Sequence, residues 1–232
     1  MSQTSSLSIF EGRKEERLNS GVADQVSIRT FYTVMCATLL WGFLVNALLV
    51  AFFADSVREL LAQVNPWVFV IGFLAISIGG IVLAVSSNNP AFSFLGYNML
   101  VLPMGLELCL IVPAMSAAVV VKALLLTGIV TATMTLLGII RPQVFLGLGR
   151  TLFIALLVGL VAELVAVFVF HYTGTVFEWL FVIIFSGYIG YDVAKAQMYP
   201  KTVDNAIDCA LDIYIDVINL FVILLRLFSR EN

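Results

Sequence analysis

The stretch IDCALDIYIDVINLF, residues 207–221, places three aspartates in a segment whose other residues are almost all apolar. These aspartates, Asp208, Asp212 and Asp216, follow one another at four-residue spacing. On an α-helix a four-residue step turns by about 400°, so the three carboxyl groups form one stripe along a single face. The meaning of this stripe depends on whether the helix is surrounded by water or by lipid.

The composition of the whole chain indicates lipid. Of the 232 residues, 61% are hydrophobic and 12% are charged, and the mean hydropathy is +1.06. Soluble domains contain about 45–50% apolar and about 25% charged residues. The sequence therefore predicts an all-α integral membrane protein whose partner is the lipid bilayer. We see no soluble domain large enough to carry catalysis and expect neither an enzyme nor a nucleic-acid partner.

Polar breaks and prolines divide the apolar sequence into seven predicted membrane-spanning helices. One transmembrane domain is expected at residues 30–228, between a polar tail at 1–29 and a short tail at 229–232. The seven helices are predicted at 30–54, 66–85, 91–113, 116–140, 151–170, 176–197 and 203–228. Because an acidic stripe cannot face lipid, we predict a seven-helix bundle with the seventh helix at its centre.

The distribution of lysine and arginine in the short loops predicts the orientation. Eight basic residues fall on the side of the N-terminal tail and three on the opposite side. The first set is Arg13, Lys14, Arg17, Arg29, Arg141, Arg150, Lys195 and Lys201, and the second is Arg58, Arg226 and Arg230. We therefore expect a cytoplasmic N-terminus and an external C-terminus. The expected location is a bacterial plasma membrane, with an organellar membrane as the alternative.

Ionisable residues within the spans are candidates for function, because each costs roughly 2.5–3.5 kcal/mol at the bilayer centre. Asp192 lies near the end of the sixth predicted helix, and a short turn leads into the seventh. We expect Asp192 to pair with Asp216, with Asp212 as a third member, although counting from the turn places Asp192 level with Asp212. Two carboxylates in a poorly solvated site cannot both ionise easily, so such a pair can share a proton. Asp208 is expected to be hydrated near the membrane surface.

A second candidate is an ion pair between Glu107 and Lys122. These residues lie at similar distances from the tight turn at 113–116, on the two arms of one helical hairpin. Pairing would offset the cost of inserting each charge into the membrane. In the alternative reading, Lys122 reaches the outer interface while Glu107 is protonated or faces a cavity.

Three classes of membrane protein carry acidic groups in this arrangement. An intramembrane aspartyl protease would match Tyr191-Asp192, but its GxGD motif is replaced by IYID at residues 213–216, and no PAL triplet follows. A retinal protein requires a lysine in the seventh helix, and residues 203–228 contain none. A cation channel or carrier requires only acidic groups along a hydrated route, which this sequence supplies.

The segments FVIIFSGYIGYDVAKAQ (181–197) and TVDNAIDCALDIYIDVINLFVILLRLF (202–228) resemble the end of the transmembrane Bax inhibitor motif family. Its members end in a YD pair on the sixth helix and an LYLD-x-INLF-like stretch on the seventh. The resemblance implies a pH-sensitive calcium leak in which Asp192 and Asp216 form the proton-sensing pair. Calcium is then the transported ion rather than a cofactor, and it would pass transiently near Asp192, Asp212 and Asp216.

The sequence leaves alternatives open for the ionic contact from the second helix, for the transported cation and for the function. Family members often carry a basic cluster after the second helix, whereas this chain has Ser86-Ser87-Asn88-Asn89, so an ionic latch from that helix is in doubt. Hard divalent cations prefer carboxylate and carbonyl oxygens, but potassium, sodium or protons could use the same lining. The alternative function is an interaction protein without ion flux, which regulates a membrane protease or a cell-death or stress pathway through membrane-protein partners.

Overall fold

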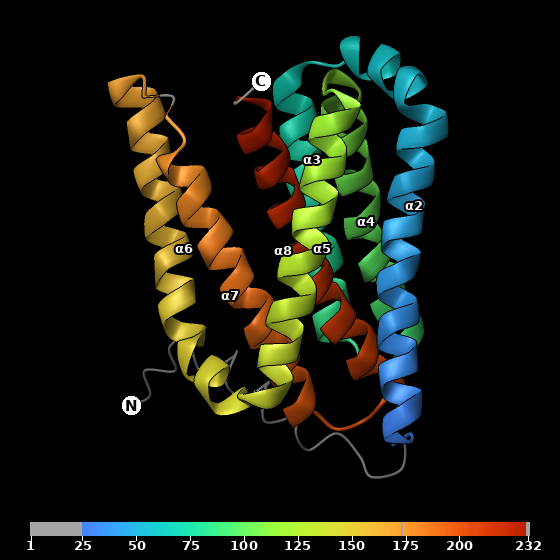
Figure 1. Ribbon diagram of the computed structural model, residues 1–232. Helices are drawn as coiled ribbons and strands as arrows, with labels where there is room; N and C mark the ends of the chain where they lie inside the picture. The colour runs from blue at the N-terminus through green and yellow to red at the C-terminus, as the bar shows by residue number, and fades with distance from the viewer. Residues whose placement is uncertain (1–24, 173, 231–232) are drawn as a thin grey trace, which may run out of the picture.

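The computed structural model describes residues 25–172 and 174–230, and these parts are helical (Figure 1). The described α-helices are α2 (Ile28–Ala62), α3 (Pro66–Ser86), α4 (Pro90–Ile111), α5 (Ala117–Ile140), α6 (Pro142–Phe170), α7 (Val176–Met198) and α8 (Val203–Ser229). A short 3-10 helix, η2 (Val112–Ala114), follows α4. Of the two predicted tails, residues 1–24 and 231–232 lie outside the described residues.

Asparagine caps and prolines set several of the helix starts. Asn65 and Asn89 each accept a hydrogen bond from the backbone N–H two residues later, at 2.9 and 3.0 Å, and proline occupies the first turn of α3 and α4. Pro142 likewise begins α6 directly after Arg141, the C-cap residue that follows the end of α5 at Ile140. The predicted helix start at residue 151 is therefore wrong, because this proline starts the helix before the strongly apolar segment.

Six helices, α2 to α7, are long and apolar enough to cross a membrane, as judged over the described residues. The remaining helix, α8, is also long, with 27 residues, but the aspartates of the acidic stripe make it less apolar than the other six. In Figure 1, α2 begins at the lower end of the bundle and α8 finishes at the upper end. We call these the Ile28 end and the Ser229 end.

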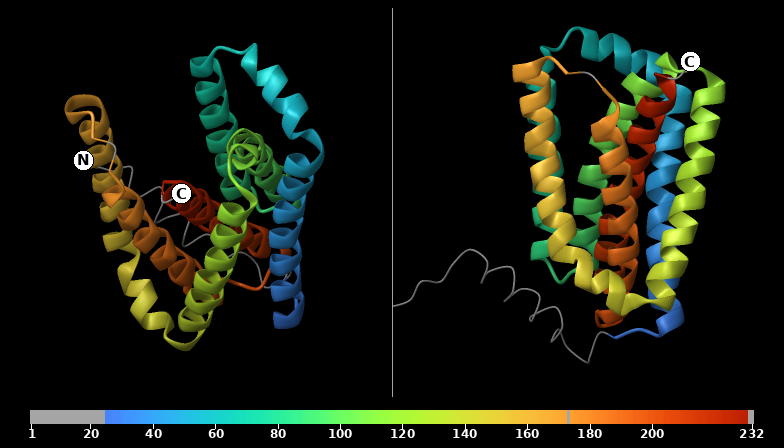
Figure 2. Two further views of the ribbon diagram at one scale, coloured as in Figure 1. Left: turned by 45° about the horizontal axis from the view of Figure 1, so that its top comes forward. Right: turned by 60° about the vertical axis from the view of Figure 1, so that its left-hand side comes forward.

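Among the described helices, α8 is enclosed most completely by protein. It packs against α7, α2, α5 and α4, and 20 of its 27 residues are buried. By contrast, α3 packs mainly on α4, and α6 packs mainly on α7. Figure 2 shows α7 lying between α6 and α8 in its left-hand view. The carboxyl groups of α8 are therefore shielded from lipid by neighbouring helices.

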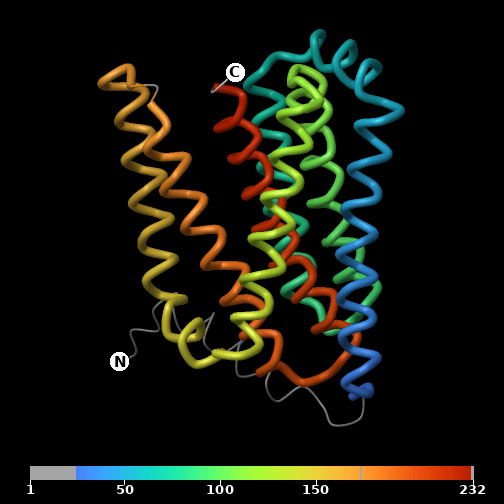
Figure 3. The backbone as a smooth tube through the Cα atoms, in the orientation of Figure 1, coloured from blue at the N-terminus to red at the C-terminus, as the bar shows by residue number. Residues whose placement is uncertain are grey.

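The turn between α7 and α8 is held by side-chain hydrogen bonds. Lys201 Nζ donates to three backbone carbonyls at the end of α7, at 2.9, 3.0 and 2.9 Å, which satisfies groups that a helix end leaves unpaired. Burial lowers the pKa of the Lys201 ammonium. Thr202 then caps α8 by accepting from the Asn205 N–H at 3.1 Å. Figure 3 shows this turn running across the lower end of the bundle, from α7 to the start of α8.

Candidate functional site

The carboxyl groups of Asp192 on α7 and Asp216 on α8 meet inside the bundle. They lie in hydrogen-bonding contact with each other, and the two residues are only 7% and 5% exposed. Ionised carboxylates are acceptors alone, so two carboxyl groups can share a hydrogen bond only when one of them holds a proton. The structure thus brings together the two aspartates that the sequence analysis paired, in a geometry that suits one shared proton.

Lys195 contacts the third member of the group, Asp212. Lys195 Nζ lies 2.6 Å from Asp212 Oδ2 and 3.5 Å from Asp192 Oδ1. Counting from the turn places Asp212 level with Asp192, but the structure brings Asp216, one turn further along α8, into contact with Asp192. Asp212 is consequently one turn closer to the Ile28 end, where Lys195 meets it.

Lys195 is the site residue that the sequence analysis missed, since it was counted among the basic residues of the turn. It belongs to α7, and its side chain is 23% exposed. Its three-residue spacing from Asp192 was the available signal, because residues at this spacing share one helix face. The rings of Tyr191 and Tyr199 lie 5.9 and 5.8 Å from its Nζ, and such rings favour a nearby cation.

The site has more acidic groups than cations. Among the described residues, Lys195 is the cation that forms salt bridges with this group, to Asp212 and Asp192, whereas the group contains the three carboxyl groups of Asp192, Asp212 and Asp216. Asp208 adds a further carboxyl group one turn before Asp212 and is 3% exposed. The expectation that Asp208 is hydrated near the surface is therefore wrong, because the neighbouring helices cover the first turns of α8.

No group of three histidine, cysteine or acidic side chains within residues 25–172 and 174–230 is placed to hold a metal ion. The ammonium of Lys195 supplies the positive charge beside Asp212 and Asp192 in this conformation. A calcium ion near these aspartates would therefore have to compete with Lys195.

At the Ser229 end, α8 and the residue after it form two ion pairs with neighbouring helices. Arg226 Nη2 lies 3.9 Å from Glu107 Oε1 on α4, and Arg230 Nη2 lies 3.0 Å from Glu178 Oε1 on α7. The structure thus gives Glu107 a partner other than Lys122, with which the first of the two readings had paired it. The side chain of Lys122 is exposed, and no salt bridge joins it to Glu107.

These features define a class of protein, the multi-pass helical membrane proteins with a buried acidic site. A family model described as "Inhibitor of apoptosis-promoting Bax1" matches residues 24–232. The chain therefore belongs to this Bax inhibitor-1-like family, and the resemblance seen in the sequence is confirmed.

The relatives include membrane proteins from bacteria and a protein from a plant. The chain is 26% identical to Inner membrane protein YbhL of Escherichia coli (strain K12) over 235 residues, which cover 93% of this chain and 98% of the relative. It is 31% identical to a membrane protein of Streptococcus pyogenes serotype M6 over 158 residues, which cover 64% and 68% of the two chains. It is 28% identical to Protein LIFEGUARD 1 of Arabidopsis thaliana over 214 residues, 88% of each chain.

Proposed function

We propose that this protein is a pH-sensitive calcium leak channel of a bacterial plasma membrane, with α8 as a seventh span at the centre of the bundle. The burial of α8 and the opposite positions of the Ile28 and Ser229 ends support an odd number of spans. The inner-membrane relative from Escherichia coli supports the location. In this proposal the Ile28 end faces the cytoplasm, as the basic residues predict.

The observation that carries the proposal is the buried contact between Asp192 and Asp216. When the shared proton leaves, two like charges remain together in a poorly solvated site, and their repulsion favours separation of α7 from α8. When a second proton arrives, both groups become neutral and their attraction to Lys195 weakens. Either change alters the balance between two arrangements of α7 and α8, so calcium flux should depend on pH.

Lys195 is proposed to act as the latch of this device. Its ammonium holds Asp212 from within α7, so the site does not require a cation from the segment after α3. A calcium ion that reaches the aspartates must displace this ammonium or pass beside it, because both cations seek the same carboxylate oxygens. Opening is thus expected to involve a change in the contact between Lys195 and Asp212.

Purified full-length protein in liposomes that contain a calcium-sensitive dye provides the direct test. We expect calcium entry whose rate changes between about pH 5 and pH 8, the range in which perturbed carboxyl groups of functional sites titrate. Protein-free liposomes set the background. If liposomes with the protein admit no more calcium than this background at any pH in that range, the leak proposal fails.

The seven-span arrangement has its own test. Topology reporters fused before Met1 and after Asn232 should lie on opposite sides of the membrane, with the N-terminal reporter in the cytoplasm. Reporters on the same side would contradict the seventh span, whatever the outcome of the calcium measurement.

A second candidate is an interaction protein of a cell-death or stress pathway. The description of the family refers to inhibition of an apoptosis-promoting protein, and this description favours the candidate. Pull-down of the intact protein should then recover a membrane-protein partner, and Asp192→Asn should leave that binding unchanged. Recovery of such a partner together with liposomes that show no calcium flux would favour this candidate over the channel.

A further inference from the structure

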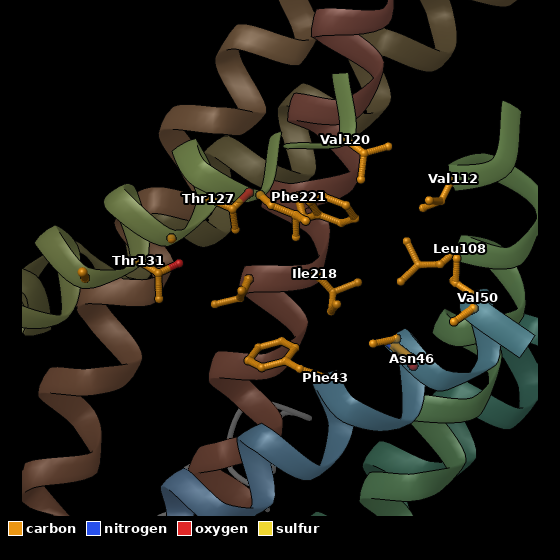
Figure 4. Close-up of a pocket in the computed structure, with 16 residues that line it drawn as sticks. Phe43, Asn46, Val50, Leu108, Val112, Val120, Thr127, Thr131, Ile218 and Phe221 are labelled. Carbon is orange, nitrogen blue, oxygen red and sulfur yellow. The ribbon is translucent and has the colours of Figure 1, made fainter. Parts of the chain in front are cut away.

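A cavity of about 630 Å³ lies among α2, α4, α5 and α8 (Figure 4). Its walls are mainly aliphatic and aromatic, and no charged side chain lines it. Leu108 from α4, Phe43 from α2 and Phe221 from α8 contribute to this apolar lining. The volume falls within the roughly 300–1,000 Å³ of small-molecule sites.

The cavity is open towards the bilayer along α5. This helix packs on α7 and α8 but not closely on α2 or α4. Leu124 of α5 lines the cavity and is 55% exposed, so it marks the lipid-facing mouth. Asn46 and Gly128, also in the lining, lie near the midpoints of α2 and α5. A ligand would therefore enter from the hydrocarbon region rather than from water.

Two polar atoms distinguish this cavity from a simple lipid-filled groove. Asn46 Oδ1 and Thr131 Oγ1 are buried and have no hydrogen-bond partner among the described residues. Asn46 is 3% exposed, and its other side-chain atom, Nδ2, donates to the Tyr214 hydroxyl. Because an unpaired buried polar atom is unfavourable, a ligand whose hydrogen-bonding group reaches one of these atoms would stabilise it.

The hydroxyl of Thr131 differs from those of its neighbours on α5. Threonine within a helix commonly donates to the backbone carbonyl four residues earlier. Thr127 and Thr133 do so, each at 2.7 Å, to Ala123 and Ile129 respectively. The hydroxyl of Thr131 instead points towards the cavity in Figure 4.

We propose that this cavity binds an uncharged, membrane-dissolved molecule of single-acyl-chain size that carries a hydroxyl group, the chemistry of a long-chain alcohol. The apolar walls hold the chain, and the absence of charged side chains from the lining excludes an ionic headgroup. A hydroxyl can accept a hydrogen bond from Thr131 Oγ1, which points towards the cavity. A bare acyl chain would leave this atom unpaired.

Photolabelling of the full-length protein in phosphatidylcholine vesicles tests the site. The probe is hexadecanol with a photoreactive diazirine in its chain, and the comparison probe is the matching diazirine alkane without the hydroxyl. We expect the alcohol to label cavity-lining residues roughly two- to tenfold more than the alkane, the preference of one net hydrogen bond. Equal labelling by the two probes would overturn the hydroxyl-bearing ligand, and absence of label from the cavity would overturn the site.

Two glycines provide a matched pair of variants that fill space. A Cβ atom added at Gly128 or at Gly72 would meet no atom of a packed neighbour within 4 Å, so both positions have open space where a side chain begins. Gly128 lines the cavity, whereas Gly72 lies on α3 outside it. Gly128→Leu should reduce labelling at least several-fold, and Gly72→Leu should not. Unchanged labelling of Gly128→Leu would show that the probe does not occupy this cavity.

Substitutions at two threonines, one as the variant and one as its control, test the hydrogen bond between the ligand hydroxyl and the cavity. Thr131→Val removes the hydroxyl that points to the cavity with little change in shape, and it should remove most of the preference for the alcohol over the alkane. Thr133→Val is the control, because its hydroxyl is satisfied within the helix. A preference that survives Thr131→Val unchanged would contradict the assigned contact.

Discussion

The first half of α8 and the residues at its end carry charge in different ways. In the first half, Asp212 and Asp216, together with Asp192 of α7, have one ammonium between them, that of Lys195. Near the Ser229 end, the two carboxylates each face their own arginine. The first group is acidic and mostly buried, whereas the second consists of matched pairs with half-exposed arginines.

The first group is suited to the exchange of protons, whereas the ion pairs near the Ser229 end are suited to holding α8 against its neighbouring helices. Ion pairs at a partly exposed surface contribute only about 0–1 kcal/mol. Like charges in a buried site are costly, so a proton is taken up or released to relieve them. We therefore expect substitutions in the first half of α8 to change the pH response and those at its end to change only stability.

The largest effect is expected from Asp192→Asn and Asp216→Asn. Each variant leaves a single carboxyl group without the like-charged partner with which it shares a proton, so the pH response of calcium flux should be lost. The ratio of flux at about pH 5 to flux at about pH 8 should approach one for both variants in dye-loaded liposomes. Asp55→Asn, an exposed aspartate near the end of α2, is the matched control and should keep the wild-type ratio. A wild-type ratio in either buried variant would contradict the proton-sharing pair.

Lys195→Met should have the next largest effect, because it leaves Asp212 without the ammonium at 2.6 Å. The two side chains are 23% and 27% exposed, so the loss is smaller than for a fully buried pair. We expect the free energy of unfolding to fall by roughly 1–3 kcal/mol, measured by thermal unfolding in detergent. The additional change Asp212→Leu should recover part of this loss by removing the unpaired carboxylate. Lys122→Met, a change at an exposed lysine, should leave stability unchanged.

Most helix boundaries could be predicted because prolines and polar breaks mark them. Predicted helices at 66–85 and 176–197 correspond to Pro66–Ser86 and Val176–Met198. The prediction failed for the end of α2 and the start of α6, where helix continues beyond the apolar segment. Hydropathy indicates which residues lie in lipid, and it contains no information on whether a helix extends into the adjacent polar region.

The candidate site was predictable in part. The pairing of Asp192 with Asp216 followed from the family motifs, but residue counting favoured Asp212, because the number of residues in a turn does not show how far the turn shifts one helix along the other. The partners Lys195 and Arg226 were missed for a common reason. Both were treated as charges in the connecting segments, yet a long basic side chain can extend along the helix surface and place its charge far from its own Cα.

A smaller effect is expected at the Ser229 end from Glu178→Gln. The Glu178 side chain is 10% exposed and its Arg230 partner is 43% exposed, at a separation of 3.0 Å. We expect a loss of about 0.5–1 kcal/mol in the free energy of unfolding, again from thermal unfolding in detergent. The pH ratio of calcium flux should remain that of the wild type. A changed ratio would show that the two regions of α8 are coupled and would contradict their separate roles in pH response and in stability.

The smallest effect concerns the partner of Glu107. Arg226 lies 3.9 Å from Glu107, and the two side chains are 49% and 29% exposed, so water screens much of their attraction. A double-mutant cycle of Glu107→Gln with Arg226→Met should give a coupling energy of roughly 0.2–0.5 kcal/mol. The corresponding cycle with Lys122→Met should give none, because the exposed Lys122 makes no ion pair with Glu107. Coupling to Lys122 without coupling to Arg226 would mean that α4 and α5 pair their charges as a hairpin, and that α8 is not held by α4 at this end.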